Sequence, residues 1–173
     1  MATWETQEHG VPAFKKIVLV GKTNSDGDLT AFDDETDIIE ALYEVPGTDA
    51  NLNLANELLD DTDLTSQDAR SNITGLREWS VGTTLNYKPE NDAYEIIRDS
   101  YIDREPIWVV YIPNIPTGDD VEEDDEGYIG RVIAENLDHS GGVGDLETVD
   151  CTLQSTSTIH WEAISEIPED VTA

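Results

Sequence analysis

A strict two-residue alternation over residues 78–87 constrains the fold of this chain more than any other feature of its sequence. Larger, mostly apolar side chains occupy every second position, and polar or small residues fill the positions between them. The apolar set comprises Trp79, Val81, Thr83, Leu85 and Tyr87. A period of two is typical of a β-strand with one buried and one solvated face. The chain must therefore provide further structure that covers one side of this strand.

A short helix is expected after this strand. Pro89 ends the alternation, and Asp92 with Glu95 three residues later forms a capping-box pattern that predicts a helix N-terminus. The helix is predicted over residues 93–101, with one apolar face for packing against the sheet. This face comprises Ala93, Tyr94, Ile97 and Tyr101.

Residues 107–112 (IWVVYI) are apolar on both faces and predict a strand in the centre of a sheet. Trp108 and Val110 belong to this strand. We expect Trp108 to be buried between the helix and the sheet, close to Ile97 and Tyr101.

The remaining segments predict a mainly β (α+β) fold, a β-sandwich or partly closed barrel with one packed helix. Strands are expected at 14–21 and 52–58, and a long hairpin at 128–137 and 148–161 around a Gly-rich turn. Residues 34–43 fit either a helix or a strand, and Pro46-Gly47 after them predicts a turn. The length of 173 residues suits a single domain.

The charge is strongly acidic and spread along the chain. Nine Lys and Arg against 39 Asp and Glu give a formal net charge of −30. Self-repulsion at this density strains a compact fold, and molar salt relieves it because the Debye length falls to about 3 Å. The composition therefore indicates adaptation to high salt. It also argues against nucleic-acid binding, which needs clustered Lys and Arg.

The sequence gives no support for catalysis, a cofactor or a metal site. The three histidines (His9, His139 and His160) have no metal-ligand spacing, and nucleophile-elbow and phosphate-loop motifs are absent. His139 is expected in a loop. The single cysteine, Cys151, lies in an alternating run and is expected to be a buried small apolar residue. No apolar stretch is long enough to cross a membrane.

The order and spacing of several elements resemble the major tail tube protein of long-tailed, non-contractile phages. The matching elements are the segment GLREWS (75–80), the turn at 89–92, the helix at 93–101, the strand at 106–112, the Gly-containing strand at 127–133 and the Ser/Thr-rich strand at 148–161. The resemblance covers roughly residues 63–161. An acidic segment at 33–61 and an acidic loop after Ile115 depart from the family pattern.

This resemblance implies a phage tail-tube-like fold and a structural role in a virion tail assembled in the host cytoplasm. Copies would form stacked hexameric rings, through which viral DNA passes without specific binding, together with tape-measure, terminator and baseplate-type tail proteins. Arms at 1–12 and 162–173 and a hairpin at 33–61 would join the rings. With the acidic composition, the resemblance suggests a haloarchaeal host.

The resemblance also assigns residues to the fold and to the contacts between copies. The fold motif comprises Gly75, Leu76, Trp79, Val81, Leu85, Ile97, Tyr101, Trp108 and Val110. The expected subunit interface comprises Trp4, Leu52, Leu54, Leu58 and Trp161. Two alternatives stay open: a tail terminator or head–tail connector, and a halophilic β-barrel that binds a small ligand.

Overall fold

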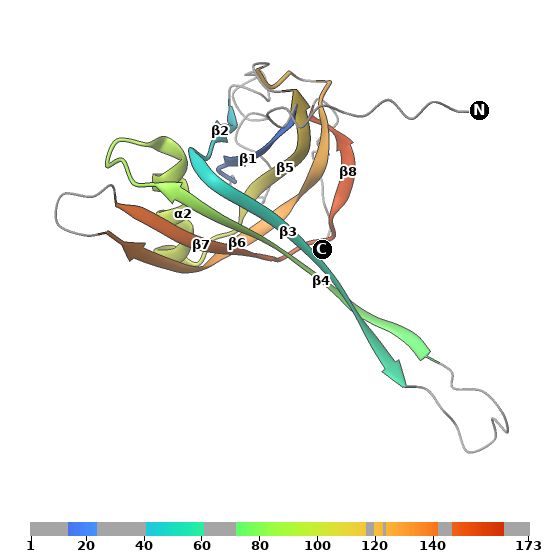
Figure 1. Cartoon of the computed structure of the whole chain (residues 1–173). Helices are drawn as coiled ribbons and strands as arrows, with labels where there is room; N and C mark the ends of the chain where they lie inside the picture. Colours follow the sequence, from blue (N-terminus) through green and yellow to red (C-terminus); the bar gives the residue numbers. More distant parts are fainter. Residues whose placement is uncertain are drawn as a thin grey trace, which may run out of the picture.

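Antiparallel strands with one helix packed against them make up the part of the chain that the computed structural model describes, namely residues 14–23, 41–60, 72–116, 120–122, 124–141 and 147–164 (Figure 1). The strands are β1 (Phe14–Gly21), β2 (Tyr43–Glu44), β3 (Gly47–Asp60), β4 (Asn72–Asn86), β5 (Ile107–Pro116), β6 (Glu126–Ser140), β7 (Thr148–Ser155) and β8 (His160–Ala163). The helix is α2 (Asp92–Asp103).

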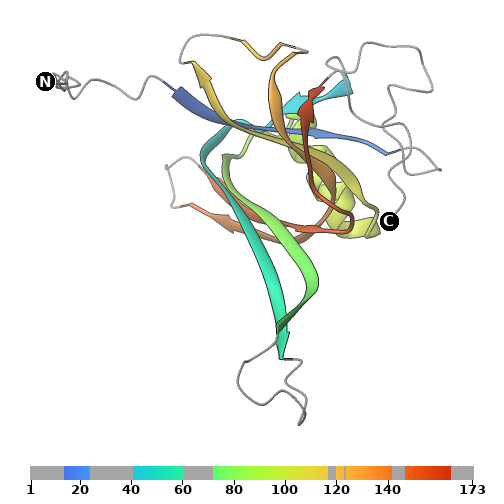
Figure 2. The same cartoon turned by 90° about the vertical axis from the view of Figure 1, so that its right-hand side faces the viewer.

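The strands form one strongly curved sheet with the order β2-β1-β5-β6-β7-β4-β3, and β8 pairs with β6. The sheet curls into an open barrel, which Figure 2 shows from one end. Among the described residues no strand ladder joins β3 to β1 or β2, although Lys16 Nζ in β1 donates a hydrogen bond to the Ala50 carbonyl oxygen in β3 at 3.4 Å. The expected mainly β fold with one packed helix is confirmed, and the barrel is not closed.

The interior of the open barrel is the larger core. The predicted alternation in β4 is confirmed, because Trp79, Val81, Thr83 and Leu85 are buried while the residues between them are more exposed. These side chains meet Ile97 of α2 and apolar residues of β1, β5, β6 and β7 in one cluster. The helix therefore covers the concave face of the sheet.

The helix begins one residue earlier than the capping-box pattern predicts. Asn91 is the N-cap, and its side chain accepts a hydrogen bond from the Tyr94 backbone N–H at 2.9 Å. The prediction that Tyr101 shares the buried face is wrong, since its side chain is 46% exposed. Ser100 faces the sheet instead, and successive helical residues point about 100° apart, so Tyr101 is rotated towards solvent.

Trp108 is fully buried, but on the opposite face of β5 from the helix. The expected contact with Ile97 and Tyr101 is therefore wrong. Because side chains alternate along a strand, Val109 faces α2 whereas Trp108 and Val110 face away from it. The second apolar cluster on that face comprises Ile17, Leu19, Leu42, Trp108, Val110, Ile112, Ile115, Ile129 and Ile164.

The pairing predicted for the early hairpin is also wrong within the described residues. The Pro46-Gly47 segment is not a hairpin tip, because β2 pairs with β1 whereas β3 starts at Gly47 and pairs with β4. The apolar alternation is compatible with this pairing, since Leu52 lies opposite Val81 and Ala50 opposite Thr83 on the core face. Of the segment 33–61, residues 33–40 and 61 lie outside the described part.

The predicted hairpin between β6 and β7 is confirmed, but the strand predicted at 148–161 is interrupted. Both β7 and β8 pair with β6, and residues 156–159 leave the ladder between them. The Trp79 ring packs at this break against Gly130, and Trp79 Nε1 donates to the Ser157 carbonyl oxygen at 2.7 Å. Residues 162 and 163 complete β8 and Ile164 is fully buried, so the predicted arm does not begin at 162. Residues 165–173 and the predicted arm at 1–12 lie outside the described part.

Candidate assembly surfaces

The β3–β4 hairpin extends well beyond the body of the protein (Figures 1 and 2). Its ladder continues to the pair Asp60 and Asn72, whereas β4 pairs with β7 only from Ser80 to Asn86. The segment of β4 before Ser80 therefore has β3 as its strand partner and no other among the described residues. Such a two-stranded projection is marginally stable alone in water and gains from a partner surface.

The outer edge of β3 is a free sheet edge within the described residues, because β4 is its only strand partner there. Residues 50–56 carry no charge, although the chain has 39 acidic residues, and Leu54 is 53% exposed. Edge strands that avoid association usually carry charges, proline or bulges along their exposed edge. Residues 50–56 contain neither a charged residue nor proline, so this edge of β3 is suited to pair with another strand.

A second free edge belongs to β6, at the opposite side of the strand series β6-β7-β4-β3 from β3. The β5–β6 ladder ends at the pair Ile107 and Val132, and beyond it the β5 side of β6 has no described strand partner. Two residues further along β6, the Ala134 backbone N–H donates to Ser100 Oγ of α2 at 3.3 Å. Beyond Val132, the four strands β6, β7, β4 and β3 thus form a sheet with two free edges, one on β6 and one on β3.

An open groove of about 460 Å³ follows this edge of β6 beside the end of α2. Its lining residues are Tyr101, Ile102, Arg104, Ile133, Ala134 and Glu135. Ile102 is 65% exposed, more than any other large apolar side chain whose burial the structure describes. This surface was not predicted from the sequence, although Ile102, an apolar residue off the apolar stripe of the helix, could have indicated it.

The face of β6, β7, β4 and β3 that points away from the core is polar. It presents hydroxyl, amide and carboxylate groups, and Thr84 Oγ1 donates to Asp150 Oδ1 at 2.5 Å while Asn136 Nδ2 donates to Asp138 Oδ2 at 2.9 Å. Residues 47–55, 78–86, 133–140 and 148–155 contain no lysine or arginine. These four segments therefore offer no lysine or arginine that would hold a phosphate, although Arg77 of β4 and Arg131 of β6 lie outside them.

His139 lies in β6 and not in the expected loop. Its Nε2 lies 3.1 Å from the Tyr94 hydroxyl, and its Nδ1 lies 2.6 Å from Glu147 Oε1. The arrangement has the form of a nucleophile, a base and an orienting carboxylate, but burial raises the pKa of Tyr94 and so opposes formation of a tyrosinate nucleophile. These contacts link the end of β6 to the first turn of α2 and to the residue before β7.

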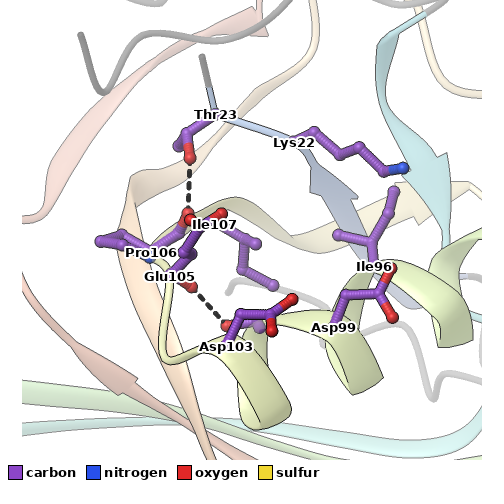
Figure 3. A pocket seen from close by; sticks show the side chains of 9 residues that line it. Lys22, Thr23, Ile96, Asp99, Asp103, Glu105, Pro106 and Ile107 are labelled. Atoms are coloured by element: carbon purple, nitrogen blue, oxygen red, sulfur yellow. Dashed lines mark hydrogen bonds between the residues drawn. The ribbon is translucent and has the colours of Figure 1, made fainter. Parts of the chain in front are cut away.

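A small hollow lies between the end of β1 and α2. Its volume of about 180 Å³ is smaller than that of typical ligand pockets, which span roughly 300–1,000 Å³ (Figure 3). Two hydroxyls that line it bond within the protein: Thr23 Oγ1 donates to the Pro106 carbonyl oxygen, and Ser100 Oγ donates to the Glu105 carbonyl oxygen.

Across the described ranges, no three or more His, Cys, Asp or Glu residues are placed to hold a metal ion. Of the helices in those ranges, none is both long and apolar enough to cross a membrane.

The predicted interface residues fall into separate places. Leu52, Leu54 and Leu58 share β3, where Leu52 is half-buried and Leu54 exposed. Trp161 lies in β8, 47% exposed, with its ring edge-on to Tyr128 at 4.6 Å and its Nε1 donating to Glu126 Oε2 at 3.1 Å. Trp4 is outside the described residues. The structure thus groups the three leucines and separates them from Trp161.

Comparison with solved structures shows where this fold occurs. A chain from the tail of an empty gene transfer agent particle, solved with C6 symmetry, superposes with a TM-score of 0.59 at 17% identity, covering 84% of this chain and 96% of that one. The SPP1 tail tube gives 0.59 at 16% identity, covering 92% and 81%. The fold is tail-tube-like.

A similar fold also occurs in a sheath/tube terminator of a contractile injection system. The sheath/tube terminator of the PVC extracellular contractile injection system in its extended state gives a TM-score of 0.54 at 12% identity, covering 91% of this chain and 100% of that chain. No protein-family model matches the sequence, and no curated protein matches it.

Proposed function

We propose that this protein is a tail tube subunit, a structural virion component without enzymatic activity. The observation that supports this most is the four-stranded sheet β6-β7-β4-β3, which is free at both edges and polar on its outer face. Its tail-tube-like fold adds support. Copies of the chain, each a single domain, assemble into hexameric rings, and the rings stack into a tube in the virion tail.

The polar face of this sheet lines the channel in the proposed tube. Asp138 and Asp150 lie on it, and residues 47–55, 78–86, 133–140 and 148–155 carry no lysine or arginine. Like charges repel DNA phosphates, and hydroxyl and amide groups give no strong anchor for them. Viral DNA therefore passes through the lumen without specific binding.

The projecting β3–β4 hairpin takes the ring-joining role that the sequence analysis gave to residues 33–61. It extends away from the four-stranded sheet (Figure 1), as a contact to an adjacent ring requires. The terminal segments around Trp4 and Trp161 supply further contacts in this proposal. The other tail proteins, including a tape measure and a baseplate-type complex, meet the tube at its ends and in its channel, and assembly takes place in the host cytoplasm.

The proposed tube is adapted to high salt, consistent with a halophilic, haloarchaeal host. A ring of six chains carries 6 × −30 = −180 formal charges, which need strong screening for the copies to approach. The rings should therefore form in molar NaCl and dissociate at about 0.1 M.

Electron microscopy of the purified protein in molar NaCl tests the proposal. We expect six-fold rings and tubes with a central channel, and a protein that stays monomeric at every salt and protein concentration would refute it. Rings that never stack would favour a tail terminator or head–tail connector, the alternative that the similarity to the PVC terminator supports. A monomer that binds a small ligand would favour the β-barrel alternative.

A further inference from the structure

We infer that the stacking of the proposed rings depends on pH through His139, whose protonation neutralises Glu147 at the end of the sheet that meets the next ring. The inference rests on the proposed function and adds to it a response to acidity. Its structural basis is the set of contacts that His139 makes with Tyr94, Tyr87 and Glu147.

The His139 contacts lie at the end of the four strands that is opposite the projecting hairpin (Figure 1). Strand β4 begins in the hairpin at Asn72 and ends at Asn86, directly before Tyr87, and β6 ends one residue after His139. Rings that stack in one direction bring unlike ends together, so the hairpin of one ring faces this end in the next ring. The His139 end is therefore a ring-to-ring surface in the proposed tube.

The imidazole of His139 is held from three sides. Its Nδ1 lies 2.6 Å from Glu147 Oε1, and its Nε2 lies 3.1 Å from the Tyr94 hydroxyl oxygen. The Tyr87 ring meets the imidazole edge-on, with the two ring centroids 5.3 Å apart. Because both ring nitrogens have a partner, the imidazole cannot turn away from Glu147 without losing these contacts.

Protonation changes the charge of this arrangement and keeps its hydrogen bonds. A carboxylate only accepts, so the neutral imidazole donates its Nδ1–H to Glu147 and accepts the Tyr94 hydroxyl proton at Nε2. The protonated imidazole donates from both nitrogens, and the Tyr94 hydroxyl oxygen accepts the second bond. The Glu147 charge is therefore uncompensated beside a neutral His139 and forms an ion pair beside a protonated one.

The other groups around His139 keep their charge over the same pH range. Burial raises the pKa of Tyr94, so its hydroxyl stays neutral between about pH 5 and 8, where histidines change charge. Arg98 of α2 interacts with Tyr94, but its guanidinium pairs with Asp99 at 2.8 Å. Asp138, the neighbour of His139 on β6, points to the opposite face of the strand.

The proposed ring multiplies a weak effect. Chains of net charge −30 repel one another, and one uncompensated carboxylate per chain adds to this repulsion at the ring ends. The side chains of His139 and Glu147 are 37% and 45% exposed, so their ion pair should change the contact of each chain by roughly twofold. Over six chains, a twofold effect becomes about sixtyfold in the stacking equilibrium. The 2.6 Å contact is also shorter than the Debye length of about 3 Å in molar salt, so it persists there.

Electron microscopy of tube length in molar NaCl tests the inference. Wild-type tubes should be several-fold longer at about pH 5.5 than at about pH 8, while rings form at both. His139→Gln should give short tubes at both pH values, because Glu147 then stays uncompensated. Glu147→Gln should give long tubes at both, because the charge is gone.

His160→Gln is the matched control. The His160 side chain is 35% exposed and its Nδ1 lies 3.9 Å from Glu162 Oε1, but β8 pairs with the other end of β6. This variant should keep the wild-type dependence of tube length on pH. Circular dichroism at each pH shows which variants are folded, and either His139→Gln or Glu147→Gln is sufficient for the comparison.

Wild-type rings that stack equally at both pH values would overturn the inference and leave the proposed function standing. A His139→Gln or Glu147→Gln variant that keeps the wild-type pH response would also overturn it, as would a His160→Gln variant that loses this response. Absence of wild-type rings at every pH would reject the proposed function and the inference together.

Discussion

Gly130→Ala should destabilise the fold, because a methyl group has no space at this position. A Cβ atom on Gly130 would lie 2.4 Å from Cζ2 and 2.9 Å from Cη2 of the Trp79 ring, and 3.2 Å from the Thr158 carbonyl oxygen. The ring is not free to move, since it is 3% exposed and its Nε1 donates to the Ser157 carbonyl oxygen at 2.7 Å. Any displacement strains that hydrogen bond as well as the packing.

Overpacking of a core costs about 1–3 kcal/mol, and a lost neutral hydrogen bond adds about 1 kcal/mol. We therefore expect Gly130→Ala to lower the free energy of unfolding by about 2–4 kcal/mol. Trp79→Phe removes the two ring atoms that the methyl group would meet. In that background the added cost of Gly130→Ala should fall to about 1 kcal/mol or less, a coupling of roughly 1–3 kcal/mol.

Urea unfolding at fixed molar NaCl, followed by far-UV circular dichroism, gives the free energies for all four proteins of this cycle. Gly82→Ala is the control: its Cβ would lie 2.9 Å from the Asn51 side-chain amide, which is exposed and can rotate away, so the cost should be below about 1 kcal/mol. Additive effects of Gly130→Ala and Trp79→Phe would refute the packing argument. Equal costs for Gly82→Ala and Gly130→Ala would refute it too.

Three further predictions concern single positions. Trp108→Ala should lower the free energy of unfolding by roughly 3–5 kcal/mol, because it empties the centre of the second core; a melting temperature near wild type would contradict this. Asn91→Ala should cost about 1 kcal/mol through loss of the N-cap hydrogen bond, whereas Asp92→Ala should cost less; denaturant titration compares them. Burial raises the pKa of Cys151 from 9.0 to about 12, so its contribution to stability is present below pH 9 and lost as the pH rises towards 12. Cys151→Ala should flatten that part of the stability–pH profile in equilibrium unfolding, and an unchanged slope would contradict the assignment.

The sequence could predict the elements whose signals are local. The period of two in β4 depends on which side of one strand is buried, and the helix after Pro89 depends on its own spacing and cap. Both signals sit within a few residues, so both elements are found where expected, with the helix starting one residue early, at Asp92.

Other features depend on partners far along the chain. An apolar run such as 107–112 shows that both faces are buried but not which face meets the helix, and so the placement of Trp108 beside Ile97 failed. The partner of β3 was missed because its alternation matches any strand with the same period, and only the whole sheet selects β4.

The candidate assembly surfaces depend both on local sequence signals and on contacts between distant segments. The neutral run in β3 and its leucines are visible in the sequence, whereas the free edge of β6 exists because the ladder with β5 ends at Val132 while β6 continues to Ser140. The length of one strand relative to its neighbour is a tertiary property. The exposure of Ile102 follows in turn from where α2 ends against that strand.

The long strand β6 gives the molecule a mechanical property. Its first half belongs to the sheet with β5 and β8, and its second half to the sheet with β7, β4 and β3, so one unbroken backbone spans both. A force applied along this strand would load both ladders in parallel, and many hydrogen bonds must then fail together before the halves separate. In the proposed tube, strain at the inner surface would therefore spread to the outer layer of each subunit, which favours a stiff tube over one whose layers slide.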